Sequence, residues 1–205
     1  MIKILISIVS VAVLVGLIFF IFKKPAPITN FPGDGASIVA FGDSLIEGVG
    51  ATKGNDFVSL LSREINTPII NMGVSGDTSG RGLERVDKVA AEDPKIVLVL
   101  FGGNDFLRKV PVATTFKNID HIVAKLQDSG AVVVLLGIRG SILSDPYEEH
   151  FERIAKERGA LYVPDVLDGL IGNRKYMSDT IHPNDVGYAK IAKKVLPALE
   201  KALGL

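Results

Sequence analysis

Residues 38–50 read IVAFGDSLIEGVG, an apolar run that stops abruptly at a polar turn. Residues 38–41 are typical of a buried strand, and Gly42 and Asp43 end the run, so that Ser44 follows the carboxyl end of the strand. Ligands of open α/β sheets bind at this edge. The stretch alone leaves two interpretations: Ser44 displays a reactive hydroxyl, or Asp43 or Ser44 merely caps the helix that follows.

The rest of the chain repeats the pattern of an apolar run followed by an amphipathic helix. Further strands are predicted at residues 68–72, 96–101, 131–136 and 161–163, and helices at residues 57–65, 83–90, 111–126, 145–159 and 186–203. Strands that alternate with helices predict an α/β fold with a parallel sheet covered on both faces. Because crossover connections are right-handed, all strand-to-helix loops are expected at one edge of that sheet.

The N-terminal residues differ in composition from the rest. Residues 4–22 carry no charged side chain, and as a helix they would be about 28 Å long, close to the thickness of a bilayer's hydrocarbon core. The run is longer than the apolar part of a cleaved signal peptide, and no small-x-small cleavage pattern follows it. We therefore expect an uncleaved transmembrane anchor at residues 1–24, a proline-containing linker at residues 25–36 and a single domain at residues 37–205.

The distribution of charge limits the partners of this domain. The first 24 residues contain three lysines and no acid, so residues 25–205 contain 20 basic against 23 acidic side chains. A slightly acidic domain argues against binding to nucleic acid, which needs a basic face. We expect the domain to be membrane-anchored on the extracytoplasmic side, although nearly equal flanking charges leave the orientation open. The oligomeric state stays undetermined.

Cysteine is absent, which excludes disulfides, thiolate nucleophiles and thiolate zinc sites. Acidic residues and histidines do not cluster at metal-ligand spacing, so we expect neither a metal nor a cofactor. The G-x-S-x-G motif of α/β-hydrolases is also absent around Ser44, as are dinucleotide-binding and P-loop motifs.

A reaction at the Ser44 hydroxyl needs a general base, and the chain contains three histidines. His121 and His150 lie on predicted amphipathic helices whose core positions are taken by other residues, so both are expected to face solvent. His182 lies in a loop three residues after Asp179 and is the base candidate by elimination. A neutral imidazole takes the serine proton on one nitrogen when an acceptor such as Asp179 holds the hydrogen of the other. By itself, this D-x-x-H pattern is equally typical of a surface turn.

Attack on a carbonyl group builds negative charge on its oxygen, and donors aimed at that charge commonly supply the largest catalytic contribution. Gly73 could offer a backbone N–H without a side chain that obstructs the substrate, and Asn104 has a side-chain amide that donates. Each residue taken singly is equally typical of a turn. Both follow predicted strands, so the sheet edge would bring them toward Ser44.

Four motifs together resemble the SGNH, or GDSL, hydrolase family. The motifs are Gly42-Asp43-Ser44-Leu45, Asn71-x-Gly73, Gly102-Gly103-Asn104-Asp105 and Asp179-x-x-His182-Pro183. They occur in the family's order and span the domain from residue 37 onward. Residues 73–78 and 103–108 are similar to the branch that contains bacterial acyl-CoA thioesterase I, also called lysophospholipase L1, and related arylesterases.

The resemblance implies a flavodoxin-like three-layer sandwich around a five-stranded parallel sheet. It implies that Ser44 is the nucleophile, that His182 acts as base and then acid, and that Asp179 orients His182. The implied oxyanion donors are the N–H groups of Ser44 and Gly73 and the side chain of Asn104. The implied reaction is hydrolysis of small-molecule carboxylic esters or acyl thioesters through an acyl-enzyme. The N-terminal anchor lies outside the family pattern.

Two other functions fit the same residues. The first is a carbohydrate esterase or acyltransferase that removes or moves acetyl groups on envelope glycans. The second is a catalytically silent, membrane-tethered binding module on the same fold. Both are distinguishable from an acyl-ester hydrolase by the reactivity of Ser44 and by the length of the acyl group accepted.

Overall fold

The computed structural model of the 205-residue chain describes residues 27–139 and 146–205. The predicted anchor at residues 1–24 therefore lies outside the described residues. Within the two described segments, no helix is both long enough and apolar enough to cross a membrane.

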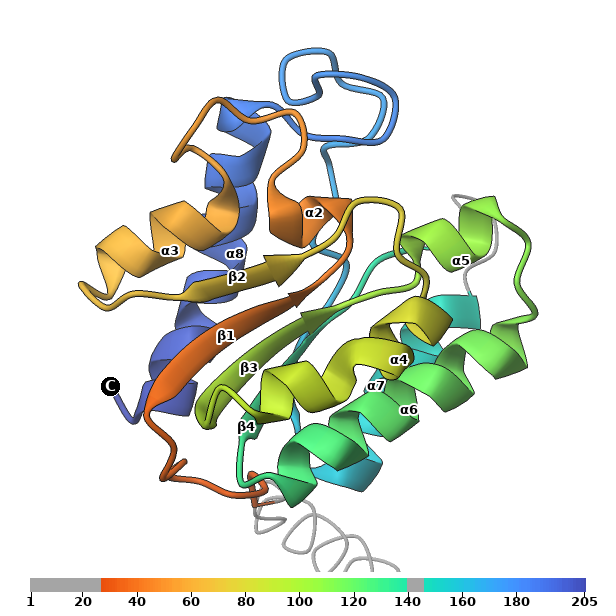
Figure 1. Cartoon of the computed structure of the whole chain (residues 1–205). Coiled ribbons are helices and arrows are strands. Elements are labelled where there is room, and N and C mark those ends of the chain that lie inside the picture. Colours follow the sequence, from red (N-terminus) through yellow and green to blue (C-terminus); the bar gives the residue numbers. More distant parts are fainter. Residues whose placement is uncertain (1–26, 140–145) are drawn as a thin grey trace, which may run out of the picture.

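A single sheet of five parallel strands forms the middle of the domain (Figure 1). Its strands are β1 (Ser37–Gly42), β2 (Ile70–Gly73), β3 (Pro94–Leu100), β4 (Val132–Leu136) and β5 (Leu161–Val163), in the order β2-β1-β3-β4-β5. Strand order reverses between β1 and β3, because β2 lies on one side of β1 and the later strands lie on the other, and doubly wound sheets bind their ligands at such a point. The prediction of a five-stranded parallel sheet is confirmed.

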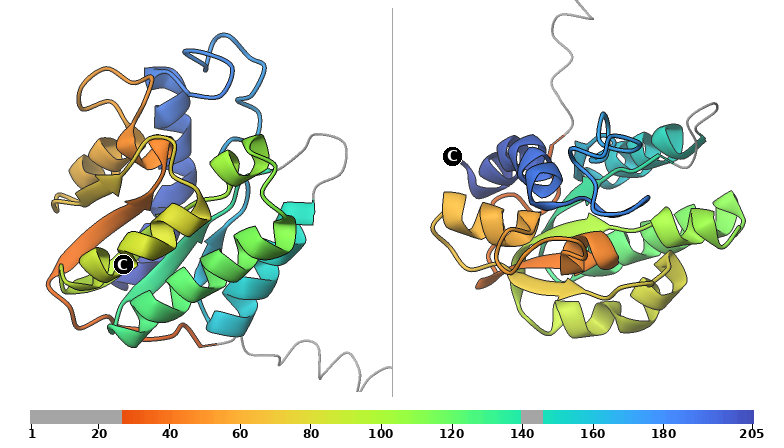
Figure 2. Two further views of the ribbon diagram at one scale, coloured as in Figure 1. Left: turned by 45° about the vertical axis from the view of Figure 1, so that its right-hand side comes forward. Right: turned by 90° about the horizontal axis from the view of Figure 1, so that it is seen from above.

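Helices cover both faces of the sheet, which confirms the three-layer prediction (Figure 2). Helices α3 (Phe57–Glu64) and α8 (Asp185–Leu203) cover one face, and α4 (Ser79–Ala90), α6 (Val112–Asp128) and α7 (Pro146–Arg158) cover the other. The central strands are buried on both sides because of these layers: every residue of β4 is buried, whereas the edge strand β2 has no buried residue. Continuous apolar runs such as residues 132–136 are the sequence pattern of such covered strands.

Two short helices begin within three residues of a strand end; the one at Ser44 was expected only under the capping interpretation, and the other was not predicted. They are α2 (Ser44–Glu47), which follows β1, and α5 (Gly103–Leu107), which follows β3. Each is little more than one turn long, too short for a 3.6-residue apolar period to be recognised. Gly48 ends α2 with a φ of 92°, a left-handed conformation that glycine adopts without strain.

The predicted linker at residues 25–36 is bound to the domain over much of its described length. Thr29 N donates to Gly159 O at 2.9 Å, Asn30 Nδ2 to Ala131 O at 3.1 Å, and Ala36 N to Asp93 O at 2.8 Å. All three acceptors immediately precede a strand or lie within two residues of one. The segment therefore runs along the edge of the sheet opposite α2 and α5 (Figure 1).

Candidate active site

Ser44 is the first residue of α2, and its neighbour Asp43 is the N-cap of that helix. The Asp43 Oδ1 atom accepts a hydrogen bond from Leu45 N at 3.0 Å. Because Asp43 satisfies the helix terminus, the Ser44 hydroxyl is not needed as a cap. The two interpretations of this turn are thus compatible: Asp43 caps the helix while Ser44 presents its hydroxyl elsewhere.

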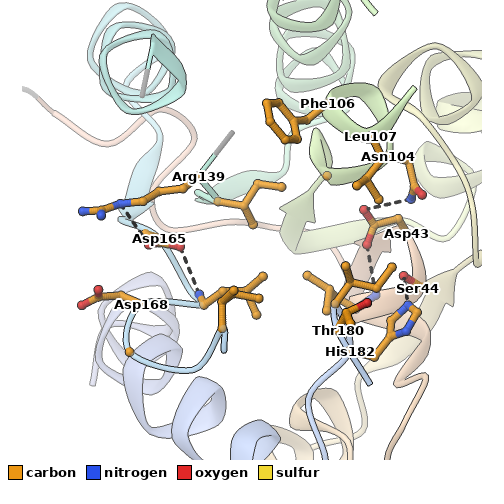
Figure 3. Close-up of a pocket in the computed structure, with 17 residues that line it drawn as sticks. Asp43, Ser44, Asn104, Phe106, Leu107, Arg139, Asp165, Asp168, Thr180 and His182 are labelled. Atoms are coloured by element: carbon orange, nitrogen blue, oxygen red, sulfur yellow. Dashed lines mark hydrogen bonds and ion pairs between the residues drawn. The ribbon is translucent and has the colours of Figure 1, made fainter. Parts of the chain in front are cut away.

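Ser44, His182 and Asp179 form one continuous hydrogen-bonded chain. The Ser44 Oγ atom lies 3.1 Å from His182 Nε2, and His182 Nδ1 lies 2.7 Å from Asp179 Oδ2. Figure 3 shows the imidazole directed at the serine. The structure therefore brings together the three residues that the sequence nominated, in the geometry of a nucleophile, a base and an orienting acid.

Asp179 is held ionised by the hydrogen bonds that it accepts. Its second oxygen, Oδ1, accepts the backbone N–H groups of Ile181 at 2.8 Å and His182 at 2.7 Å. The side chain of His182, followed by these two N–H groups, lowers the pKa of Asp179 to about 2. A permanent negative charge therefore faces the imidazole nitrogen that must keep its proton.

The first turn of α8, just after His182, is hydrogen-bonded to the loop that follows α2. Asp185 accepts the backbone N–H and the hydroxyl of Thr52, both at 2.7 Å. Tyr188, fully buried in α8, donates its hydroxyl to Val49 O at 2.8 Å. These bonds join the start and the end of the domain beside the catalytic pair. No pattern in the sequence signals them, because the partners are far apart along the chain.

The other two histidines take no part in this arrangement. His121 is exposed on α6, as predicted. His150 is half-buried, with its ring stacked on Phe116 at a centroid distance of 4.6 Å, so it is less exposed than predicted. In the described part of the chain, no three His, Asp or Glu side chains lie close enough together to hold a metal ion.

Asn104, the second residue of α5, points its amide between two acidic residues. Its Nδ2 atom donates to Asp77 O at 3.0 Å and lies 3.4 Å from Asp43 Oδ2 (Figure 3). The second contact is long for a hydrogen bond and weak. A substrate oxygen in the cavity that Asn104 lines together with Ser44 and His182 could replace Asp43 as the acceptor of this weakly bound amide hydrogen.

Gly73 differs from the sequence-based expectation of a free donor. Its N–H donates to Asn71 Oδ1 at 2.9 Å, so this donor is already occupied. A Cβ atom at Gly73 would lie 2.1 Å from Glu47 N, and the glycine is thus required by the close packing of β2 against α2. The absence of a side chain at Gly73 allows α2, the helix that carries Ser44, to pack closely against β2. The sequence had instead predicted that this absence serves to leave space for the substrate.

Gly76, which the sequence analysis did not single out, lies in the same loop. Its φ of 81° is in the left-handed region, and its N–H has no acceptor among the described residues. The next residue, Asp77, supplies the carbonyl that accepts the Asn104 amide. Gly76 therefore carries an unoccupied backbone donor one residue before the carbonyl that binds Asn104. Gly76 lies within residues 73–78, which resemble one branch of the family, but no residue pattern marks its own N–H as a free donor.

Asp43 is an acid buried beside the nucleophile. Removal from water raises its pKa to about 7, although the hydrogen bond from Leu45 N opposes the shift. The negative charge of Asp105, which is also buried, adds to the increase. Asp43 therefore changes charge near neutral pH at a position 3.4 Å from the Asn104 amide.

A cavity of about 600 Å³ opens in front of Ser44. Its apolar lining consists of Leu45, Phe106, Leu107, Ile138, Leu167, Ile171 and Ile181. On the side away from Ser44, the Arg139 guanidinium pairs with Asp165 at 3.2 Å (Figure 3). This volume and the apolar lining are typical of a binding site for a small organic molecule.

Comparison with known proteins agrees with this geometry. The sequence profile of the GDSL-like lipase/acylhydrolase family matches residues 40–190. Esterase TesA of Pseudomonas aeruginosa is 33% identical over 180 residues, which cover 82% of this chain and 89% of that protein. Thioesterase 1/protease 1/lysophospholipase L1 of Escherichia coli K12 is 28% identical, over 72% of this chain and 76% of the relative.

Solved structures extend the likeness to three dimensions. A crystal structure of TesA superimposes with a TM-score of 0.75 at 31% sequence identity, and the match covers 82% of this chain and 100% of the TesA chain. The sequence match, the shared fold and the serine, histidine and aspartate at one sheet edge agree with one another. The chain therefore belongs to the GDSL-like lipase/acylhydrolase family and is a hydrolase of the SGNH type.

Proposed function

We propose that the protein hydrolyses carboxylic esters and acyl thioesters through an acyl-enzyme on Ser44, with His182 and Asp179 as its partners. The observation that carries the proposal is the hydrogen-bonded chain from Ser44 Oγ through both imidazole nitrogens to Asp179 Oδ2, at 3.1 and 2.7 Å. The esterase and thioesterase names of the relatives support the same reaction class.

In the first half-reaction, the Ser44 Oγ atom attacks the carbonyl carbon while its proton moves to His182 Nε2. The imidazolium that forms faces the ionised Asp179, which stabilises it. The tetrahedral intermediate then breaks its bond to the leaving oxygen or sulfur, and His182 returns the proton to that atom. In the second half-reaction, His182 removes a proton from water as the water oxygen attacks the acyl carbon. The bond to Ser44 Oγ then breaks, His182 returns the proton to that oxygen, and a carboxylic acid is released.

The oxyanion of each intermediate needs donors that the protein does not use elsewhere. We assign three: the Ser44 N–H, which lies at the first position of α2 where helices leave N–H groups unpaired, the Asn104 amide and the Gly76 N–H. Gly76 takes the place that the sequence analysis gave to Gly73, because the Gly73 N–H is occupied by Asn71 Oδ1.

A short p-nitrophenyl ester tests the reaction directly. Wild-type protein should release p-nitrophenol, and Ser44→Ala should abolish the release, whereas Ser129→Ala at the far end of α6 should leave it unchanged. A fluorophosphonate probe should label wild-type protein and fail to label Ser44→Ala. Folded wild-type protein that neither turns over the ester nor reacts with the probe would instead identify a catalytically silent binding module.

The cavity favours acyl groups longer than acetyl. About 600 Å³ of space with seven apolar lining residues exceeds what a two-carbon acyl group fills, and each methylene buried there adds binding energy of about 0.8 kcal/mol. A panel of esters and acyl-CoA thioesters from two to twelve carbons should show kcat/KM rising with length before it levels off. Activity confined to acetyl esters would favour the carbohydrate esterase instead.

We also propose that residues 1–24 anchor the chain in a membrane with the domain on the extracytoplasmic side, because residues 4–22 carry no charge. The first described residues are bonded to the domain, where Thr29 N donates to Gly159 O at 2.9 Å. The full chain should stay in the membrane pellet after alkaline carbonate, and a chain lacking residues 1–26 should be released.

A further inference from the structure

Arg85 of α4 joins three segments of the chain with one guanidinium group. Its Nε atom donates to Asp77 Oδ2 at 2.7 Å, its Nη1 to Met72 O at 2.8 Å and its Nη2 to Gly42 O at 2.8 Å. The acceptors belong to the loop after β2, to β2 itself and to the last residue of β1. Each of the three nitrogens is thus bonded to a different segment.

The surroundings of this group are largely dry and held in one geometry. The Arg85 and Asp77 side chains are 17% and 9% exposed, and the guanidinium carbon lies 4.4 Å from the centre of the Phe41 ring. Buried ion pairs with satisfied hydrogen bonds and a stacked guanidinium have little freedom to shift. A lysine ammonium lacks the planar fork needed for these three acceptors.

Two of the three joined segments carry the proposed chemistry. Gly42 O belongs to the residue two positions before Ser44, so Arg85 holds the end of the strand from which the nucleophile projects. Asp77 accepts Arg85 with its side chain and the Asn104 amide with its backbone carbonyl at 3.0 Å. A single side chain therefore connects the strand before the nucleophile to the loop against which the oxyanion donor rests.

We propose that Arg85 is a positioning residue that sets the spacing between Ser44 and the oxyanion donors Asn104 and Gly76. It touches neither the substrate cavity nor the reacting atoms, and it acts through Gly42 and Asp77. The inference rests on the proposed esterase function. A displacement of about 1 Å between a nucleophile and its electrostatic partners lowers turnover by about 100-fold, so the effect is measurable in protein that is fully folded.

The first variant is Arg85→Lys, which keeps the positive charge beside Asp77 but loses the planar fork. We expect kcat for the p-nitrophenyl ester to fall about 10- to 100-fold while KM changes less than about twofold, because the substrate cavity is intact. Active-site titration with the fluorophosphonate should still label every chain. Fully labelled protein with a low kcat separates misplacement of catalytic groups from partial unfolding.

The second variant, Asp77→Asn, removes the charged acceptor and keeps the backbone carbonyl that binds Asn104. It should lower kcat in the same way, and the double variant with Arg85→Lys should lose little more than either single one, because the two residues act as a unit. If Arg85→Lys does not fold, Asp77→Asn decides the question alone by the same split between kcat and KM.

Arg158 provides a matched control at the opposite edge of the sheet. Its Nε and Nη2 atoms donate to Asp120 at 2.7 and 2.6 Å, an arginine-carboxylate pair that contacts no proposed catalytic group. Arg158→Lys should leave kcat unchanged. Folded, fully labelled Arg85→Lys or Asp77→Asn with wild-type kcat would overturn the inference. Failure of the proposed function would instead appear as wild-type protein without Ser44-dependent turnover.

Discussion

The Ser44 Oγ atom lies 3.1 Å from His182 Nε2, although 138 positions separate the two residues in the sequence. One residue follows β1 and the other precedes α8, and the hydroxyl of Tyr188 holds the two regions together through Val49 O. Through this contact, Ser44 at the start of a capped helix can act as a nucleophile, and His182 in a loop can act as its base.

Asp179→Asn should inactivate the enzyme without unfolding it. The substituted oxygen would keep the backbone N–H groups of Ile181 and His182, and the new NH₂ would face His182 Nδ1. The imidazole would then carry its hydrogen on Nε2 and could not accept the Ser44 proton, so kcat should fall about 10³- to 10⁴-fold. Steady-state kinetics on a p-nitrophenyl ester measure this loss. The exposed Asp128→Asn serves as control, and an Asp179→Asn enzyme within tenfold of wild type would contradict the assigned role.

The protonation of Asp43 should make stability depend on pH. The pKa of Asp43 is about 7 in the folded protein, whereas that of an ordinary aspartate is 3.8. Between these two pH values, Asp43 is protonated in the folded protein and ionised in the unfolded chain. The proton on Asp43 therefore stabilises the fold at pH 4, and that contribution disappears as the pH rises through 7.

Asp43→Asn isolates this effect, because the amide oxygen still accepts Leu45 N and does not titrate. The free energy of unfolding in urea, measured from pH 4 to 8 for both proteins, gives the test. Wild type should lose stability relative to Asp43→Asn as the pH rises, and the difference should level off above pH 7. A difference that stays constant with pH would show that Asp43 is ionised throughout.

Leu107→Ser should shorten the acyl groups that the enzyme prefers. Leu107 lines the cavity and is 54% exposed, so its replacement removes apolar contact with a long chain without opening the core. We expect kcat/KM for an octanoyl ester to fall about tenfold and that for an acetyl ester to change little. Val186→Ser is the control, because Val186 is 49% exposed and lies outside the cavity. Equal losses for both esters would place the acyl group elsewhere.

Gly73→Ala should destabilise the protein through α2. A Cβ at this position would lie 2.1 Å from the backbone nitrogen of Glu47, which must move with the helix that carries Ser44. The free energy of unfolding should fall by about 1 to 3 kcal/mol. In Gly80→Ala the nearest atom is 3.6 Å away, so this variant should be at least as stable as wild type. Gly73→Ala with wild-type stability would show that α2 is not packed as described.

Much of the fold could be predicted because burial leaves a local pattern. The five strands are short apolar runs, and α3 begins just after Asp56, an N-cap whose Oδ1 accepts Ser59 N at 2.8 Å. Helix α5 was not predicted, and α2 was expected only as a helix that Asp43 or Ser44 would cap, because one turn is too short to show a period. The hydrogen bonds between the linker and the domain could not be predicted for another reason: their acceptors, such as Gly159 O, are distant in sequence.

The sequence by itself determined the residue types of the site: one serine at a strand end, one histidine off a helix and an aspartate three residues before it. Only the tertiary structure decided which backbone donors are free, because the Gly73 N–H is taken by Asn71 and the Gly76 N–H is not. Only the tertiary structure placed the Arg85 guanidinium against the end of β1, the strand before Ser44. Hydrogen bonds between distant segments depend on the path of the whole chain, and no local pattern of residues records that path.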